Sequence, residues 1–161
     1  MQYCGGINEV DDGMETIGLA VFRDDKLVGE LNNIETLSHL ITTNNLDIAT
    51  ISIPSPFNQT DTIALSITKE SRTRNSVKFV NSFPFIRSHS RISANILSLD
   101  PNVDYSNADN IRLVEQYAKA FLENNIRSYL YKTAQDFRSD IAGFGSLARR
   151  HFWTVRRLGK R

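Results

Sequence analysis

The sequence predicts an α+β domain: a mostly antiparallel sheet of about five strands, with a long β-hairpin arm, packed against a short helix and a long C-terminal helix. Three observations lead to this class. Apolar or alternating runs typical of strands recur between residues 17 and 96. Residues 34–43 and 109–137 repeat apolar side chains at helical spacing. The glycine-containing stretch after residue 137 predicts a further short helix.

The composition is that of a folded globular protein. The 161 residues are 40% hydrophobic and 23% charged, with a formal net charge of +1. This length supports one core, and no apolar run reaches the roughly 18 residues that a membrane span requires. The single cysteine, Cys4, excludes an internal disulfide. Because no apolar signal core precedes Cys4, we expect no lipid on it.

We expect residues 1–16 to be a flexible N-terminal segment, because they are rich in Gly and Asp. A single domain would then occupy residues 17–158. It would begin with a β-hairpin, since Ile17 to Phe22 and Leu27 to Leu31 flank the turn-forming residues 24–26. The unbroken apolar character of the first strand predicts a central position or cover on both faces.

A short helix is expected next, from Ile34 to about Thr43, with a pair of asparagines before it and another after it. Asparagine caps helix N-termini and tolerates the left-handed conformation at helix ends. A β-branched run at residues 46–53 then predicts a strand that Pro54 would stop. Residues 62–68 alternate apolar and polar side chains, which predicts a strand with one buried face.

The hairpin arm is predicted from two long strands with polar middles. The strand that begins near residue 62 would continue to Val80, turn at residues 81–83 and return from Pro84 to Ile96. The polar middle indicates that the arm projects beyond the core, where its charge would oppose pairing with other chains. Its basic residues are Arg72, Arg74, Lys78, Arg87, His89 and Arg91.

The longest helix is predicted from about Asp109 to Phe137, because its apolar residues fall on one broad helical face. Residues 106–109 resemble a capping box at its start. At 1.5 Å per residue such a helix is roughly 40 Å long, which is enough to cross a small sheet.

Residues 137–150, which we call the signature segment, follow this helix. Ser139 and Asp140 both suit a helix N-cap. In a helix starting there, the two glycines face different directions, so we expect only one to pack closely against the long helix or the sheet. Phe144 would anchor the buried face. The candidate structural or partner-interface residues are Ser139, Asp140, Gly143, Phe144, Gly145 and Trp153.

No catalytic, metal or cofactor site is predicted, so we expect a protein that is not an enzyme. None of the three histidines has a Cys or Glu partner at metal-ligand spacing. The glycines of the signature segment lack the preceding strand and the following Lys-Ser/Thr of a phosphate loop. A triad of Ser139, Asp140 and His151 is disfavoured, because the adjacent Ser and Asp would point in different directions.

The signature segment resembles the C-terminal signature of the Ger(x)C family, the C subunits of spore germinant receptors related to GerAC and GerBC. The resemblance rests on Ser139-Asp140-Ile141 and Gly143-Phe144-Gly145, followed by a basic pair and an aromatic residue. The stretch from Gly18 to Gly29 is similar to a hairpin of the same family. The two matches span essentially residues 15–158. This chain has His151-Phe152-Trp153 where the family commonly has an aromatic-proline-x-x-Trp pattern.

The resemblance implies a non-catalytic domain that acts through protein–protein contacts in a nutrient germinant receptor. In the family, this subunit is a lipoprotein on the outer face of the spore's inner membrane. Its partners are an integral membrane permease-like subunit and a membrane-anchored subunit. The lipid-bearing cysteine of the family lies in an upstream region that Cys4 does not match. We expect no metal and no cofactor, and a nucleic-acid partner is disfavoured.

Two other functions stay open from the residues themselves. The basic arm, together with six basic and no acidic residues in the tail at 149–161, suits nucleic acid or an anionic membrane. Phe152 and Trp153 in that tail would add stacking contacts with bases. The third hypothesis is a small hydrolase, which a convergent polar pocket would indicate.

Overall fold

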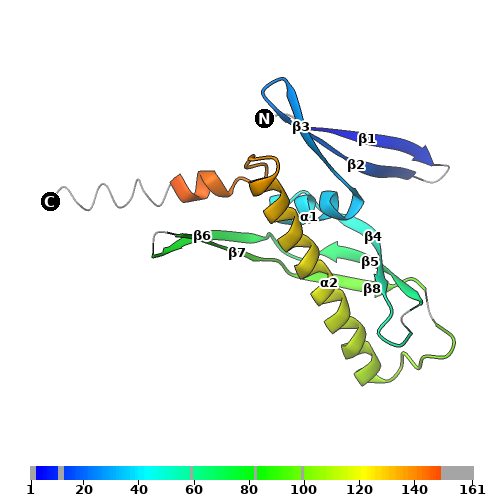
Figure 1. The fold of residues 1–161 in the computed structure, drawn as a ribbon. Helices are drawn as coiled ribbons and strands as arrows, with labels where there is room; N and C mark the ends of the chain where they lie inside the picture. Colours follow the sequence, from blue (N-terminus) through cyan, green and yellow to red (C-terminus); the bar gives the residue numbers. More distant parts are fainter. Residues whose placement is uncertain (1–2, 11–12, 59, 82, 99, 150–161) are drawn as a thin grey trace.

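Within the described residues, three antiparallel sheets and two main helices make up the fold (Figure 1). α1 (Asn33–Thr43) lies between the first sheet and the second, and α2 (Ala108–Gln135) runs diagonally across the molecule. A further helical stretch, residues 144–149, follows α2. The computed structural model describes residues 3–10, 13–58, 60–81, 83–98 and 100–149.

The first sheet has the strand order β1–β2–β3. Its strands are Tyr3–Val10, Gly13–Arg23 and Lys26–Leu31. The predicted hairpin is confirmed as β2–β3, and its turn contains Asp24 in the left-handed conformation, with φ at 59°. β2 is the central strand, as its unbroken apolar run predicts.

The first sheet extends into the segment that was expected to be flexible. β2 begins at Gly13 and β1 pairs with it, so that Tyr3 lies opposite Val21. Backbone N–H and C=O groups pair whatever the polarity of the side chains, so a strand edge can take a Gly-rich partner. The flexibility of residues 1–16 stays a prediction.

α1 spans Asn33–Thr43, and asparagines form both of its ends. The side-chain oxygen of Asn32 accepts the Glu35 backbone N–H at 2.9 Å, and the Glu35 carboxylate accepts the Asn32 N–H at 2.8 Å. These two bonds satisfy two N–H groups that a helix start leaves unpaired. Asn44 ends the helix in the left-handed conformation. The predicted helix and its caps are therefore confirmed.

The second sheet has the order β4–β5–β8. Its strands are Ile48–Pro54, Thr62–Lys69 and Ile92–Ile96. The predicted alternation along β5 is confirmed, because Ile63, Leu65 and Ile67 are all buried. Their face packs against α1 and α2 to form the larger core of the domain.

The third sheet is the hairpin arm, formed by β6 (Arg74–Val80) and β7 (Phe83–His89). The prediction of uninterrupted strands from residue 62 to 96 is wrong, because β5 and β6 are separate and so are β7 and β8. The Thr73 hydroxyl donates to the Ile41 carbonyl at 2.7 Å, and the Thr73 N–H donates to Asn44 Oδ1 at 2.6 Å. These bonds to α1 redirect the chain between the two sheets.

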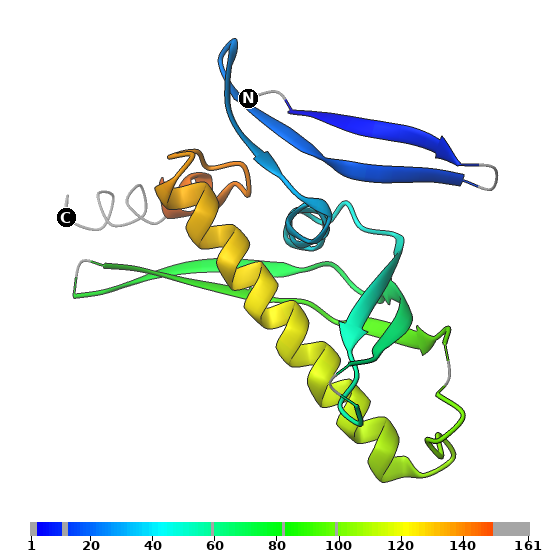
Figure 2. The ribbon, with the colours of Figure 1, turned by 45° about the vertical axis from the view of Figure 1, so that its right-hand side comes forward.

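α2 spans Ala108–Gln135 and crosses the β4–β5–β8 sheet (Figure 2). Its N-cap is Asn107, whose side chain accepts the Asp109 N–H at 2.9 Å. The capping box that was expected to begin at Ser106 does not form. The Ser106 hydroxyl donates to the Asp104 carboxylate instead. A helix of this length reaches both cores, as its predicted span indicates.

A second, smaller core joins the first sheet to the C-terminal part of the chain. Its buried members are Leu19, Val21, Leu31, Tyr129 and Phe137. The predicted α+β class is confirmed. The strands are distributed over three small sheets, whereas the sequence predicted one sheet of about five strands.

Candidate functional site: the signature segment

The signature segment begins where the chain turns back at the end of α2. The N–H groups of Asp136 and Phe137 both donate to the Lys132 carbonyl, at 2.9 Å and 3.3 Å. Arg138 then takes a positive φ of 47°, and the Ser139 N–H donates to the Thr133 carbonyl at 3.0 Å. These bonds satisfy carbonyls that a helix end leaves open, and they direct the segment back across the last turn of α2.

Phe137 fixes the first residue of the segment in the second core. Its ring is buried and contacts Gly29 of β3 so closely that a Cβ at Gly29 would overlap the ring. This is a close approach that only glycine allows. The Nζ of Lys132 lies 5.5 Å from the centre of the same ring, within range of a cation–π interaction.

Lys132 also ties the segment to α1 and β3. Its Nζ donates to both Glu35 carboxylate oxygens, at 2.7 Å and 2.9 Å, and to the Glu30 carbonyl at 3.0 Å. The same Glu35 carboxylate caps α1. One ion pair therefore holds the start of α1, the end of β3 and the end of α2 together.

Ser139 and Asp140 lie in different environments. Ser139 is buried and Asp140 is exposed. Neither begins a regular helix, because residues 141–143 form turns and the helical stretch starts at residue 144. The prediction of a helix starting at these two residues is therefore wrong. Asp140 still satisfies the helix start, since its Oδ2 accepts the Gly145 N–H at 2.6 Å.

The two glycines serve this turn, and neither packs against α2 or a sheet. Gly143 has a φ of +78° and open space around its missing side chain, so it is required by its backbone conformation. A Cβ at Gly145 would lie 2.7 Å from Asp140 Oδ2, so this glycine gives the capping carboxylate access to the backbone. The expectation that one glycine packs against the long helix or the sheet is wrong, because it assumed a regular helix.

The apolar residues of the segment face inward. Phe144 is 5% exposed, as predicted for the anchor of this face. Ile141 and Ala142 pack against the second core, and Ala148 is half-buried. Trp153 and His151, the remaining residues of the predicted site and of the disfavoured triad, lie outside the residues that the structure describes.

A buried polar pair that the sequence did not predict lies in the second core. The Tyr129 hydroxyl and Nδ1 of His39 are 2.8 Å apart, and both residues are at most 2% exposed. Burial lowers the pKa of the His39 imidazole. Burial also raises the pKa of the Tyr129 hydroxyl, and the negative charge of Asp140 acts in the same direction. Both groups are therefore neutral near pH 7.

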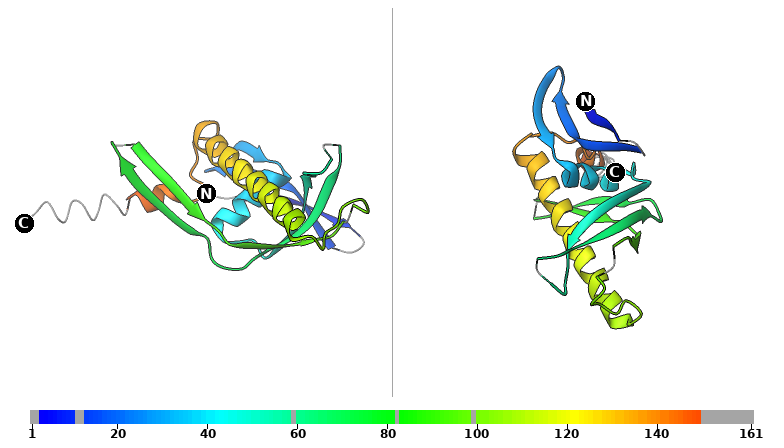
Figure 3. Two further views of the ribbon diagram at one scale, coloured as in Figure 1. Left: turned by 90° about the horizontal axis from the view of Figure 1, so that it is seen from below. Right: turned by 90° about the vertical axis from the view of Figure 1, so that its right-hand side faces the viewer.

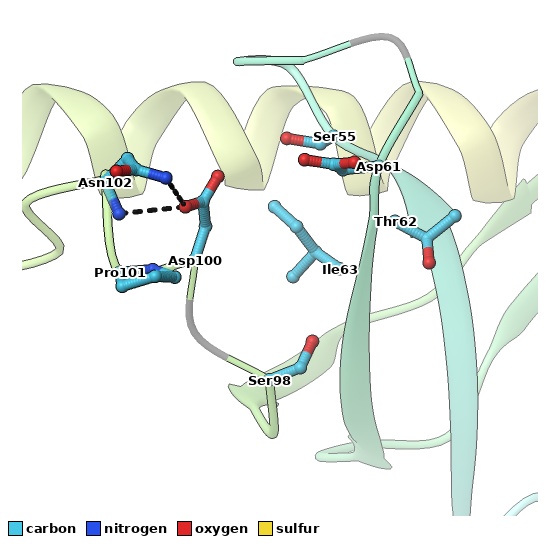
Figure 4. Close-up of a pocket in the computed structure, with 8 residues that line it drawn as sticks. All are labelled: Ser55, Asp61, Thr62, Ile63, Ser98, Asp100, Pro101 and Asn102. Carbon is cyan, nitrogen blue, oxygen red and sulfur yellow. Dashed lines mark hydrogen bonds between the residues drawn. The ribbon is translucent and has the colours of Figure 1, made fainter.

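A hollow of about 330 Å³ lies near the N-terminal end of α2, between the β4–β5 loop and the loop that follows β8 (Figure 4). Its two carboxylates form hydrogen bonds within their own loops. Asp100 accepts the Asn102 N–H at 2.8 Å, and Asp61 accepts a hydrogen bond from the Asn58 side-chain amide at 2.9 Å. Such bonds shape turns. Among the described residues, no group of three or more His, Cys, Asp or Glu is placed to hold a metal ion.

The fold of this chain resembles that of a solved protein structure. A solved structure described as the crystal structure of the GerBC protein matches with a TM-score of 0.62 at 13% sequence identity. The match covers 92% of this chain and 46% of that chain, so this chain spans about half the length of the solved one. A search of curated proteins finds no significant match.

A family model described as spore germination B3/GerAC-like, C-terminal, matches residues 17–158. The chain belongs to this family, and the resemblance stated from the sequence is confirmed. The described part of the chain contains no helix that is long and apolar enough to span a membrane.

Proposed function

We propose that residues 17–158 form a single non-catalytic domain of the C subunit of a nutrient germinant receptor. The family match supports this role in spore germination. One observation supports the proposal that the domain is non-catalytic. Asp140 and the two glycines of the signature segment have structural roles, because they form the turn that precedes the helical stretch. The domain acts through protein–protein contacts, with its surface rather than a reacting group as the functional element.

The partners in this proposal are an integral membrane permease-like subunit and a membrane-anchored subunit, on the outer face of the spore's inner membrane. The signature segment would contribute to them indirectly, by supporting the fold. Its exposed residues, Arg138 and Asp140 among them, are the part of the segment that a partner could touch. Ser139 and Phe144 are buried and would affect a partner only by changing stability.

Deletion of the gene that encodes this chain tests its role in the receptor. The expected result is loss of germination with a nutrient, and normal germination with a trigger that bypasses nutrient receptors. An affinity-tagged chain extracted from spore membranes should retain both partner subunits. Normal nutrient germination in the deletion strain, together with absence of both subunits from the purified material, would contradict the proposal.

Substitution of Ser139 by alanine tests the absence of catalysis. The hydroxyl is buried, so Ser139→Ala should change germination only as far as it changes the amount of protein. Phe144→Ala provides the comparison, since it should lower the amount strongly. A Ser139→Ala chain at wild-type level that fails to support germination would indicate a reacting hydroxyl.

The alternative of an anionic partner has its own structural observation. The arm presents exposed Arg74, Lys78 and Arg87, whereas the basic tail after residue 149 lies outside the described residues. Among the described residues, the arm is therefore the surface at which an anionic partner would bind.

A further inference from the structure

The hairpin arm extends away from both cores (Figure 3). β6 and β7 pair with each other and with no other strand of the described chain. The base of the arm is fixed, because the Asn75 amide donates to the Thr42 carbonyl of α1 at 2.9 Å and accepts the Ser88 hydroxyl at 2.8 Å. These bonds fix the direction of the arm, so its outer half projects away from the domain.

Large apolar side chains are exposed around the tip. Phe83 is 75% exposed, Val80 58%, Phe85 54% and Ile86 41%. Four such residues within a seven-residue stretch of one hairpin form a cluster, and an exposed apolar cluster indicates a binding surface. We call residues 80–86 the arm tip.

The apolar side chains lie on both faces of the arm tip. Cross-strand partners share a face, so Val80 lies beside Phe83, and Phe85 lies on that same face opposite Lys78. Ile86 is opposite Val77 and has the other parity, so it lies on the other face. A partner that covers all of these side chains must surround the tip.

Cations lie beside and behind the apolar side chains of the arm tip. Residues 71–91 contain five Lys or Arg and no Asp or Glu. Lys78 and Arg87 lie on the same face of the arm as Phe83. Counting back from the Val80–Phe83 pair along this face, the next pair contains Lys78, and the pair after it contains Arg87, opposite Ser76. At about 3.3 Å per residue these cations are roughly 7 Å and 13 Å behind the Val80–Phe83 pair.

We propose that the arm tip inserts into the interfacial layer of an anionic lipid bilayer. Apolar side chains enter such a surface by roughly 5–10 Å, and aromatic rings favour this layer. Lys78 and Arg87 then stand at the level of the lipid phosphates, where each cation contributes to binding. A bilayer surrounds the tip, as the two-faced distribution requires, whereas a nucleic-acid strand would stack on one face. This inference rests on the arm alone and is independent of the receptor role.

Vesicle binding of the full chain tests this proposal. Co-sedimentation with vesicles of phosphatidylcholine alone and of phosphatidylcholine with 30% phosphatidylglycerol should show binding to the anionic vesicles. Lys78→Gln with Arg87→Gln should lower the partition coefficient roughly 25-fold, at about fivefold per cation. Lys119→Gln with Arg127→Gln removes the same charge from exposed positions of α2 and should leave binding unchanged.

The apolar contribution needs its own variant and control. Phe83→Ser with Phe85→Ser should reduce binding at least tenfold, whereas Ile48→Ser, at a 68% exposed position of β4, should not. A tryptophan reporter, Phe83→Trp in a Trp153→Phe background, should shift its emission to the blue with anionic vesicles and be quenched by brominated lipid. Circular dichroism confirms that each variant is folded.

Three results would overturn the proposal. The first is equal sedimentation of the wild type with and without anionic vesicles. The second is binding that the cation variant loses but the phenylalanine variant retains, because that would be surface adsorption without insertion. The third is an arm that binds single-stranded DNA oligonucleotides through Phe83 and Phe85 while it ignores vesicles. None of these results bears on whether the chain copurifies with receptor subunits.

Discussion

The Tyr129 hydroxyl lies 2.8 Å from Nδ1 of His39, and this bond joins α2 to α1 inside the protein. The two rings also meet edge to face, with centroids 5.9 Å apart. Ninety residues separate the partners in sequence. The pair lies where the second core meets α1, next to the Lys132–Glu35 ion pair that joins the same two helices.

Tyr129→Phe removes the hydroxyl from this buried bond and keeps the ring. We expect a loss of about 1–3 kcal/mol in the free energy of unfolding, since His39 would lose a bond to a polar partner inside the core. Urea denaturation followed by circular dichroism measures the change. Tyr131→Phe is the matched control, because Tyr131 is 61% exposed and its hydroxyl should contribute little. Equal effects of the two substitutions would show that the buried bond is unimportant for stability.

The stability of the fold should fall in mild acid because of His39. Burial lowers the pKa of His39 in the folded state, so below the ordinary value of 6.5 the unfolded chain takes up a proton that the folded chain resists. Above pH 6.5 the residue is neutral in both states and the effect disappears. Between 6.5 and the lower folded pKa, stability should decrease by up to about 1.4 kcal/mol per pH unit.

The measurement compares urea denaturation at pH 7.5 and pH 5.5 for the wild type, His39→Gln and His89→Gln. His39→Gln should reduce the pH dependence, although it lowers stability at both values. His89→Gln should keep the wild-type dependence, since His89 is exposed on the arm. A pH dependence that His39→Gln leaves intact would assign it to other groups.

The Asp140–Gly145 contact should make two substitutions strongly non-additive. Asp140→Ala removes the carboxylate that accepts the Gly145 N–H and should cost about 0.5–2 kcal/mol. Gly145→Ala alone should break the same bond, because its Cβ would lie 2.7 Å from Oδ2. In the Asp140→Ala background this clash is absent, so Gly145→Ala should be neutral or stabilising by up to about 1 kcal/mol. A thermodynamic cycle from chemical denaturation measures the coupling, and simple additivity would argue against it.

Phe144→Ala should cost about 3–5 kcal/mol, the range for truncating a buried aromatic residue. Phe85→Ala is the matched control on the arm, where the ring is 54% exposed, and it should leave stability nearly unchanged. In spores, Phe144→Ala should lower the amount of the protein and the nutrient response together. Wild-type stability with lost receptor assembly would instead make Phe144 a direct partner contact.

Elements that depend on neighbouring residues could be predicted from the sequence. The β2–β3 hairpin, α1 and the extent of α2 follow from apolar periodicity and from capping residues a few positions away. The family resemblance likewise rests on short runs of residues. The inward position of Phe144 could be predicted as well, because Ile141, Phe144 and Ala148 follow helical spacing and share one apolar face.

The tertiary structure alone decided the features that depend on distant partners. The chain is redirected between β5, which ends at Lys69, and the arm, because Thr73 bonds to Ile41 of α1 and to Asn44, the residue that caps this helix, and no local pattern marks that position. The helical stretch starts at residue 144 rather than 139 because the chain first turns back over the last turn of α2. His39 and Tyr129 meet because two helices pack. The sequence by itself determined the two helices and the β2–β3 hairpin, since their hydrogen bonds, caps and apolar stripes join residues that are close in sequence. Packing in three dimensions determined which other strands pair, which side chains are buried together and which, like Phe83, are left exposed.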